Sequence, residues 1–190
     1  MSGNCILLFL IVWPILGGLM SFLAGRVSKR LRDYTADVVA LVELATACRL
    51  GYCLGDEQAS FLHIDGFCAL GLSFKLDGFR FVYLVVIAFM WLVTTIFSRE
   101  YLAHYRNRNR YHLFVLITQG AMMGVFLSAN LFTTFLFFEM MSLSSYVMVA
   151  QDETPEAARA AQTYLAVTII GGMATLLGLT LLYRELGTLD

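Results

Sequence analysis

The stretch that decides the fold runs from residue 111 to residue 150, YHLFVLITQGAMMGVFLSANLFTTFLFFEMMSLSSYVMVA, and Glu139 is its one formally charged residue. A helix that crosses a hydrocarbon core about 30 Å thick needs about 20 consecutive, mostly apolar residues. The stretch is therefore about twice as long as one span. Its turn-like break is Ser128-Ala129-Asn130. It predicts two membrane helices joined by a very short turn.

Segments on both sides of this stretch predict four more spans. Phe81–Ser98 precedes it and Ala160–Tyr183 follows it, and neither contains a charged residue. Farther towards the N-terminus, Cys5–Ala24 and roughly Tyr34–Leu54 are long enough to cross a bilayer. The composition agrees, because 59% of the residues are hydrophobic and 14% are charged, whereas about 25% are charged in a typical soluble domain. The predicted fold class is an all-α integral membrane bundle of about six transmembrane helices.

The segment between the second and third spans predicts a small hairpin. Two short apolar runs, Phe61–Ile64 and Phe67–Leu70, flank Asp65-Gly66. The dipeptide Asp-Gly suits a tight turn between strands. The surrounding loop, residues 55–78, carries four acidic residues and one lysine, so we expect it outside the membrane.

The basic residues predict the orientation. The cluster at Arg26–Arg32 follows the first span, and four arginines lie in Arg99–Arg110. Alternation of six spans places both segments on one side, which the positive-inside rule makes cytoplasmic. No basic region precedes the first span, which argues against a signal peptide. We expect a multi-pass protein of a prokaryotic plasma membrane, or an equivalent energy-coupling membrane, with its N-terminus outside.

Several kinds of site have no pattern in this sequence. The four cysteines form no CxxC pair and have no zinc or iron–sulfur spacing, and no nucleotide-binding loop is present. The net charge of −1 gives no reason to expect nucleic acid as a partner. We therefore expect no cofactor, no metal and no catalytic residue on this chain, so that any redox chemistry belongs to other chains.

Glu139 is the main candidate for function. It lies near the centre of the predicted fifth helix, where a carboxylate is costly and faces a partner or a wet cavity. Desolvation favours the neutral acid, which can take up and release a proton. Ser142 lies on the same helix face, and Ser145 follows, so both are candidate supporting residues for proton or ion movement. The alternative is a permanently protonated glutamate that clasps a neighbouring helix.

Glu43 is a second acid in mid-span, with a weaker claim to a role in ion translocation. Asp37, Glu43 and Arg49 are six residues apart, so they point in different directions and form no common polar stripe. Small residues indicate close helix packing elsewhere: Gly120 and Gly124 have the GxxxG spacing.

Several motifs in order give the third to sixth helices a family resemblance. They are FKLDG at 74–78, FSREY at 97–101, GVFLSANLF at 124–132, FEMMSLSSY at 138–146 and EAARAAQTY at 156–164. The chain resembles the antiporter-like subunits shared by respiratory complex I, membrane-bound hydrogenases and multisubunit cation/proton antiporters. The resemblance covers roughly Phe74–Leu182, and it divides the chain into residues 1–73, with two N-terminal helices and the external hairpin, and residues 74–190, with helices three to six.

The resemblance implies a role and a partner. Glu139 falls on the fifth-helix glutamate of the family's central proton-handling axis. The family carries its proton-handling lysine on a broken seventh helix, and this chain ends before such a helix. Only the first three helices of the first of two inverted five-helix repeats are present. We therefore expect other membrane subunits as partners, one of which supplies a lysine-bearing broken helix.

Three functions follow from the resemblance. The first is a membrane subunit of a complex I-like or hydrogenase-type oxidoreductase that contributes to proton or sodium translocation. The second is a subunit of a standalone multisubunit cation/proton antiporter. The third is a scaffold subunit that packs between pumping subunits and moves no ion.

Overall fold

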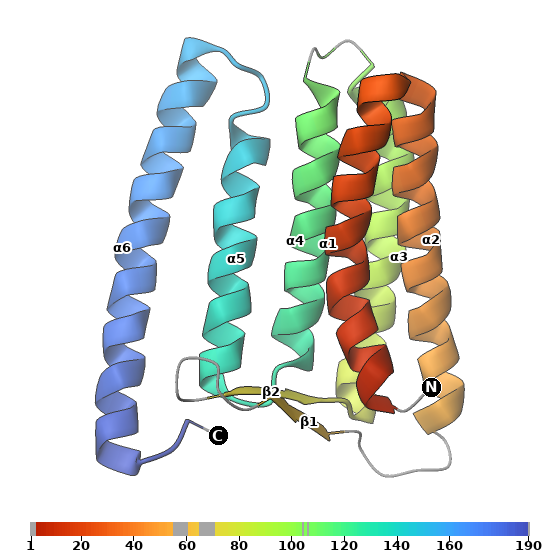
Figure 1. Ribbon diagram of the computed structural model, residues 1–190. Coiled ribbons are helices and arrows are strands. Elements are labelled where there is room, and N and C mark those ends of the chain that lie inside the picture. Colours follow the sequence, from red (N-terminus) through yellow and green to blue (C-terminus); the bar gives the residue numbers. More distant parts are fainter. Residues whose placement is uncertain (1–2, 55–60, 65–70, 104, 106, 190) are drawn as a thin grey trace.

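Six helices make up most of the described chain. The computed structural model describes residues 3–54, 61–64, 71–103, 105 and 107–189, and its helices run alongside one another with short connections (Figure 1). They are α1 (Gly3–Val27), α2 (Lys29–Leu54), α3 (Gly78–Tyr101), α4 (Arg108–Leu127), α5 (Leu131–Val149) and α6 (Pro155–Leu186). Each predicted span falls on one of these helices, and the predicted break at residues 128–130 separates α4 from α5. The all-α membrane fold is confirmed.

Two kinds of helix share the bundle. Among the described residues, α1, α3, α5 and α6 are each long and apolar enough to cross a membrane on their own. Helices α2 and α4 carry more polar residues, but they run at the same level as the others (Figure 1). Several of their polar side chains are buried, including Arg32, Glu43, His112 and Gln119. These buried polar side chains lie on the faces of α2 and α4 that turn into the bundle, whereas the outer face of α2, which includes Val38, is exposed.

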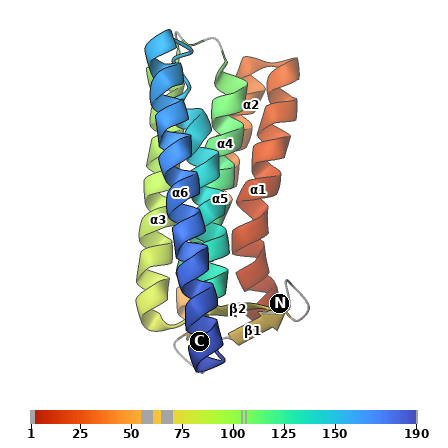
Figure 2. The same cartoon turned by 90° about the vertical axis from the view of Figure 1, so that its left-hand side faces the viewer.

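The core lies among α1, α2, α3 and α4. Leu10 of α1, Leu50 of α2, Leu84 of α3 and Met123 of α4 belong to one buried apolar cluster. Helices α1 and α4 approach closely at Gly120, where an added Cβ would lie 2.6 Å from the carbonyl oxygen of Ile11. Helix α5 packs against α4, and α6 packs against α5 at the edge of the bundle (Figures 1 and 2).

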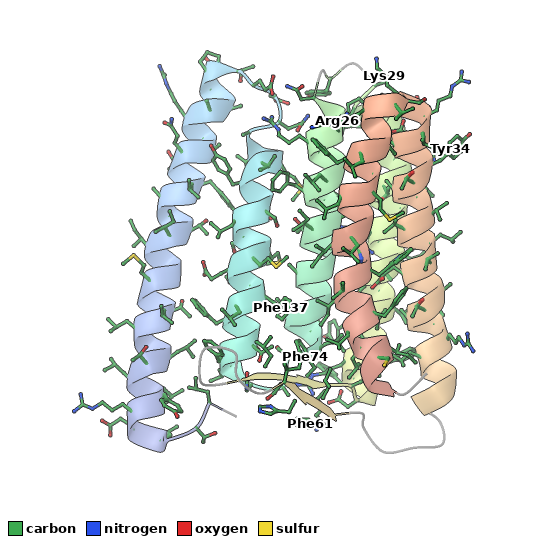
Figure 3. All side chains as sticks on the ribbon, in the orientation of Figure 1. Arg26, Lys29, Tyr34, Phe61, Phe74 and Phe137 are labelled. Atoms are coloured by element: carbon green, nitrogen blue, oxygen red, sulfur yellow. The ribbon has the colours of Figure 1, made fainter. Side chains whose placement is uncertain are left out.

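The GxxxG pair serves two different interfaces. Gly120 faces α1, whereas an added Cβ at Gly124 would lie 2.3 Å from the ring of Phe137 on α5. The absence of a side chain at Gly124 lets this aromatic ring lie directly on the α4 backbone. Phe137 also meets Phe74 edge to face, with ring centroids 5.7 Å apart (Figure 3).

A two-stranded sheet fastens the break between α4 and α5. Strand β2 (Leu72–Lys75) donates its Ser73 backbone N–H to the Thr133 hydroxyl at 3.0 Å and accepts from the Ala129 backbone N–H at 2.7 Å. Asn130 caps α5 by accepting from the Thr133 backbone N–H at 2.8 Å. Arg80 of α3 donates to the carbonyl of Ser128 at 3.0 Å. The turn is thus tied to segments more than forty residues away in the sequence.

The hairpin differs from its prediction in one strand. Strand β1 (Phe61–Ile64) is at the predicted place, and it pairs antiparallel with β2, with Phe61 opposite Lys75. The predicted turn Asp65-Gly66 and the predicted second strand Phe67–Leu70 lie outside the described residues. The observed partner of β1 is therefore Leu72–Lys75, which includes the first two residues of the FKLDG motif at 74–78. Helix α3 begins at Gly78, after the N-cap residue Asp77.

The connections lie at the two ends of the bundle as alternation requires. The α1–α2, α3–α4 and α5–α6 connections share one end, and the sheet and both termini share the other (Figure 1). At the sheet end, Asp77 caps α3 by accepting from the Arg80 backbone N–H at 2.9 Å, and this bond lowers the pKa of Asp77. The two basic segments therefore face the same side of the membrane, although the side itself is a prediction.

We expect the basic end to be cytoplasmic. In a variant without the native cysteines, Asn107→Cys should resist an impermeant thiol reagent added to intact cells, because Asn107 lies at the basic end. Glu185→Cys, which is exposed at the opposite end, is the matched control and should react readily. Labelling of Asn107→Cys without labelling of Glu185→Cys would invert the topology.

Candidate functional site

Glu139 lies in the middle of α5, on the side towards α6. It is the ninth of the 19 residues of α5, so both ends of the helix are far from it. Its side chain is half-buried. Among the described residues, no hydrogen-bond donor and no cation pairs with its carboxyl group. An acid at this depth in a membrane helix is a candidate functional group.

Gly172 of α6 makes room for the Glu139 carboxyl group. A Cβ added at Gly172 would lie 2.6 to 2.7 Å from the carboxyl atoms of Glu139. The neighbouring Gly171 has open space at the same position. Of the two adjacent glycines, therefore, Gly172 alone touches the acid, and the carboxyl group fills the place where a side chain of α6 would otherwise stand.

The serines that follow Glu139 mostly hold helices together. The Ser144 hydroxyl lies 2.7 Å from the Thr118 hydroxyl of α4. The Ser145 hydroxyl donates to the carbonyl of Met141 in its own helix at 2.8 Å. Ser142 is buried, and its backbone carbonyl accepts from the Tyr164 hydroxyl of α6 at 3.2 Å. The described bonds link α5 to both neighbours, and none of them joins Ser142 or Ser145 to Glu139.

Glu43 occupies a separate and more enclosed place. It lies on α2, on the far side of α4 from α6 (Figure 1), and its exposed fraction is 0%. Neither of its carboxyl oxygens has a hydrogen-bond partner among the described residues. The structure therefore does not bring the two candidate acids together.

Gln119 is a polar residue of the same core that the sequence patterns did not single out. It is also 0% exposed, and both polar atoms of its side-chain amide lack partners among the described residues. One turn earlier, Leu116 of α4 packs with Ala36 and Val39 of α2. Glu43 follows Val39 by four residues and Gln119 follows Leu116 by three, so helical periodicity brings both to a similar level. A signal was available, since Gln119 is an amide within an otherwise apolar run.

One side of the Glu139 site is open. In the most apolar 18-residue stretch of α6, only 6% of the residues are buried, and in the corresponding stretch of α5 the share is 22%. Phe138, beside Glu139, is 50% exposed. In a bilayer this surface meets lipid or another helix, and the described residues do not close it. Six helices of membrane length, with an acid between α5 and α6 at one edge of the bundle, define a multi-pass membrane protein with an ionisable group at membrane depth.

Comparison with known proteins identifies the family. The model of the family described as NADH:quinone oxidoreductase/Mrp antiporter, TM, matches residues 128–190. A Staphylococcus haemolyticus (strain JCSC1435) protein named as antiporter subunit mnhD2 is 34% identical over 191 aligned positions, which are 95% of this chain and 37% of the relative. The protein of the same name from Staphylococcus aureus (strain Newman) is 34% identical over 122 residues, 63% of this chain and 24% of the relative.

Two solved structures have the same fold. A chain of the membrane-bound sulfane sulfur reductase, an archaeal respiratory membrane complex, matches 97% of this chain with a TM-score of 0.86 and 21% identity, over 38% of its own length. A chain of the Mrp complex from Dietzia sp. DQ12-45-1b matches 100% of this chain with a TM-score of 0.82 and 23% identity, over 36% of its own length. This chain belongs to the antiporter-like membrane subunit family. It spans 37% of the length of the Staphylococcus haemolyticus relative.

The two adjacent glycines provide a test of the carboxyl position. Alanine favours a helix over glycine by about 1 kcal/mol, so Gly171→Ala should raise the midpoint of thermal unfolding in detergent. Gly172→Ala gains the same propensity but pushes its Cβ into the Glu139 carboxyl group, so its midpoint should rise less or fall. Equal shifts for the two variants would contradict the contact between Gly172 and Glu139.

Proposed function

We propose that this chain is part of a multisubunit cation/proton antiporter, in which Glu139 takes up and releases a proton. The observation that carries the proposal is the placement of Glu139: at mid-helix, against Gly172, and without a pairing group among the described residues. Intramembrane acids of this kind mark ion pathways and proton relays. The names of the relatives as antiporter subunits support the antiporter over the alternatives.

The geometry suits proton exchange at one carboxyl group. A water molecule that approaches from the open side can bring a proton to this carboxyl group or carry one away. The exchange needs no redox chemistry on this chain. The packing of Gly172 against the acid keeps the carboxyl group at the α5–α6 interface, where a neighbouring chain can reach it. Glu43, enclosed in the α1–α4 core, has no such access and is a weaker candidate.

The same residues would serve a second function, a proton-translocating subunit of a membrane-bound respiratory complex. The structural likeness to a chain of an archaeal respiratory complex favours it. The two functions differ in the driving force, because an antiporter exchanges ions without electron transfer. In both, we place the chain in the plasma membrane of a prokaryote, with its N-terminus outside.

The third function, a scaffold that moves no ion, depends on Glu139 as a clasp. Within the described residues the carboxyl group bonds to nothing, so a clasp would have to be completed by another chain. The proposal therefore includes a partner: a membrane subunit whose broken helix carries a lysine and packs along the open side of α5. A lysine there would supply the opposite charge that stabilises ionised Glu139.

The variant Glu139→Gln separates the relay from the clasp. Glutamine keeps the size and the hydrogen-bonding capacity but cannot titrate, so we expect near wild-type assembly and a loss of cation-driven proton movement of about 10²-fold or more. A clasp should tolerate glutamine at a cost of about 1 kcal/mol. Glu139→Asp keeps the titrating group and should be milder.

The measurement is proton movement in inverted vesicles, after sodium addition to an imposed pH gradient without an electron donor, normalised to assembled complex. Full movement with Glu139→Gln would remove the relay role. Movement that requires an electron donor in the wild type would favour the respiratory complex. Loss of assembly in both Glu139→Gln and Glu139→Asp would favour the clasp.

The partner has its own test. A photo-crosslinking amino acid at Phe138, in native membranes, should capture a second membrane subunit, and mass spectrometry should place the crosslink on a lysine-bearing helix. The same amino acid at Val38, which is 54% exposed on α2, is the control and should capture lipid or a different surface. Crosslinks from Phe138 to lipid alone would contradict the proposed partner.

A further inference from the structure

A basic pocket lies at the end of the bundle opposite the sheet. It has a volume of about 450 Å³ and lies between the α1–α2 turn and the start of α4. Four of its lining residues are cations: Lys29, Arg32, Arg108 and Arg110. Figure 3 shows Lys29 at this end of the molecule, beside Arg26. A pocket of this size accommodates a small ligand, because ligand sites are about 300–1,000 Å³.

One cation of the pocket is held rigidly. Arg32 is 2% exposed, and its guanidinium donates to Asp33 at 2.7 and 2.8 Å and to Asn109 at 2.7 Å. The Asn109 side chain lies against Gly25 of α1, where an added Cβ would be 2.5 Å from its Oδ1 atom. The glycine therefore admits the amide that orients Arg32. A fixed guanidinium loses little entropy when it binds an anion.

Other donors of the pocket remain unused. The Nε atoms of Arg108 and Arg110 are buried without a hydrogen-bond partner among the described residues. The N-terminus of α4 has no side-chain cap, and the Asn107 amide nitrogen donates to Glu153. The first N–H groups of an uncapped helix, together with its dipole, favour an anion. Buried donors without partners and an uncapped helix start thus belong to residues that line the same pocket.

Among the described residues, the charges around the pocket leave an excess of one positive charge. Three carboxylates adjoin the pocket, and each is engaged: Asp33 with Arg32, Glu153 with Arg110, and Asp152 with the Tyr105 hydroxyl, a bond that raises the pKa of Tyr105. Against them stand the four cations of the lining. Lys29 has no partner among the described residues. A phosphodiester carries one negative charge and therefore matches this excess.

We propose that this pocket binds a phosphate group, and that its source is the headgroup of an anionic membrane lipid. The pocket lies where the helices end, which is the depth of lipid headgroups, and basic pockets at cytoplasmic helix ends recognise such headgroups. The ring of Phe22 in the lining supplies an apolar wall for the glycerol portion. The site is separate from Glu139 and does not depend on the proposed ion exchange.

The test compares two adjacent basic residues in the complex purified from its membrane. Phosphatidylglycerol or phosphatidylcholine is added in detergent, and native mass spectrometry counts the lipids retained on this chain. Phosphatidylglycerol should be retained in preference, and Lys29→Gln should weaken its retention by about fivefold, the contribution of one basic side chain near an anionic lipid. Because Lys29 has no partner, its replacement leaves no carboxylate unpaired. Arg30→Gln removes the same charge from a residue that is exposed and outside the lining, so it should have no effect.

The other outcomes decide the source and the site. Inorganic phosphate could raise the midpoint of thermal unfolding of the wild type but not that of Lys29→Gln. If phosphatidylglycerol is then not retained, the pocket is a phosphate site whose ligand is soluble. Equal losses in Lys29→Gln and Arg30→Gln would show a diffuse surface attraction and overturn the proposal. No preference for phosphatidylglycerol over phosphatidylcholine, with no effect of phosphate, would overturn it as well.

Discussion

The arrangement of the later helices depends on how the backbone is satisfied at the break between α4 and α5. A chain that leaves a helix within a membrane protein exposes N–H and C=O groups, which are costly without partners in an apolar environment. Here β2 and α3 supply the partners, since Ser73 of β2 bonds to Ala129 and to Thr133, and Arg80 of α3 bonds to the carbonyl of Ser128. These bonds fix where α5 begins. The direction of α5 then follows from the ring of Phe137 on Gly124, and Glu139 comes two residues later.

The two intramembrane acids show how differently one residue type is treated within one bundle. Glu43 is fully buried, and so is Gln119, whose side chain likewise has no hydrogen-bond partner among the described residues. Glu139 lies at the α5–α6 interface against Gly172, and the described residues do not cover the outer side of this interface. Burial alone therefore does not distinguish a candidate for proton exchange. Access is the criterion behind our proposal for Glu139, because a proton has to reach the group and leave it again.

The helices and the short break between residues 127 and 131 could be predicted from the sequence, because apolar length and a polar turn are local properties. The place of Glu139 in the middle of α5 could also be predicted, since it is the single formal charge among forty residues that form two helices. The partner of β1 could not, because pairing between distant segments is decided by the whole fold. The hydrogen-bond partners of the serine hydroxyl groups could not be predicted either. Ser144 bonds to Thr118 on another helix, whereas Ser145 bonds within its own helix, and sequence spacing does not distinguish these cases.

The alternation of apolar and polar helices has a consequence for biosynthesis. Helix α2 carries seven charged residues, and a charge at the centre of a helix opposes insertion by about 2.5–3.5 kcal/mol. Neither α2 nor α4 is apolar enough to partition into lipid alone. Each is preceded in the chain by a helix that is, α1 before α2 and α3 before α4. An apolar helix that can span the membrane on its own is thus synthesised immediately before each polar helix. We expect each polar helix to insert together with the apolar helix that precedes it.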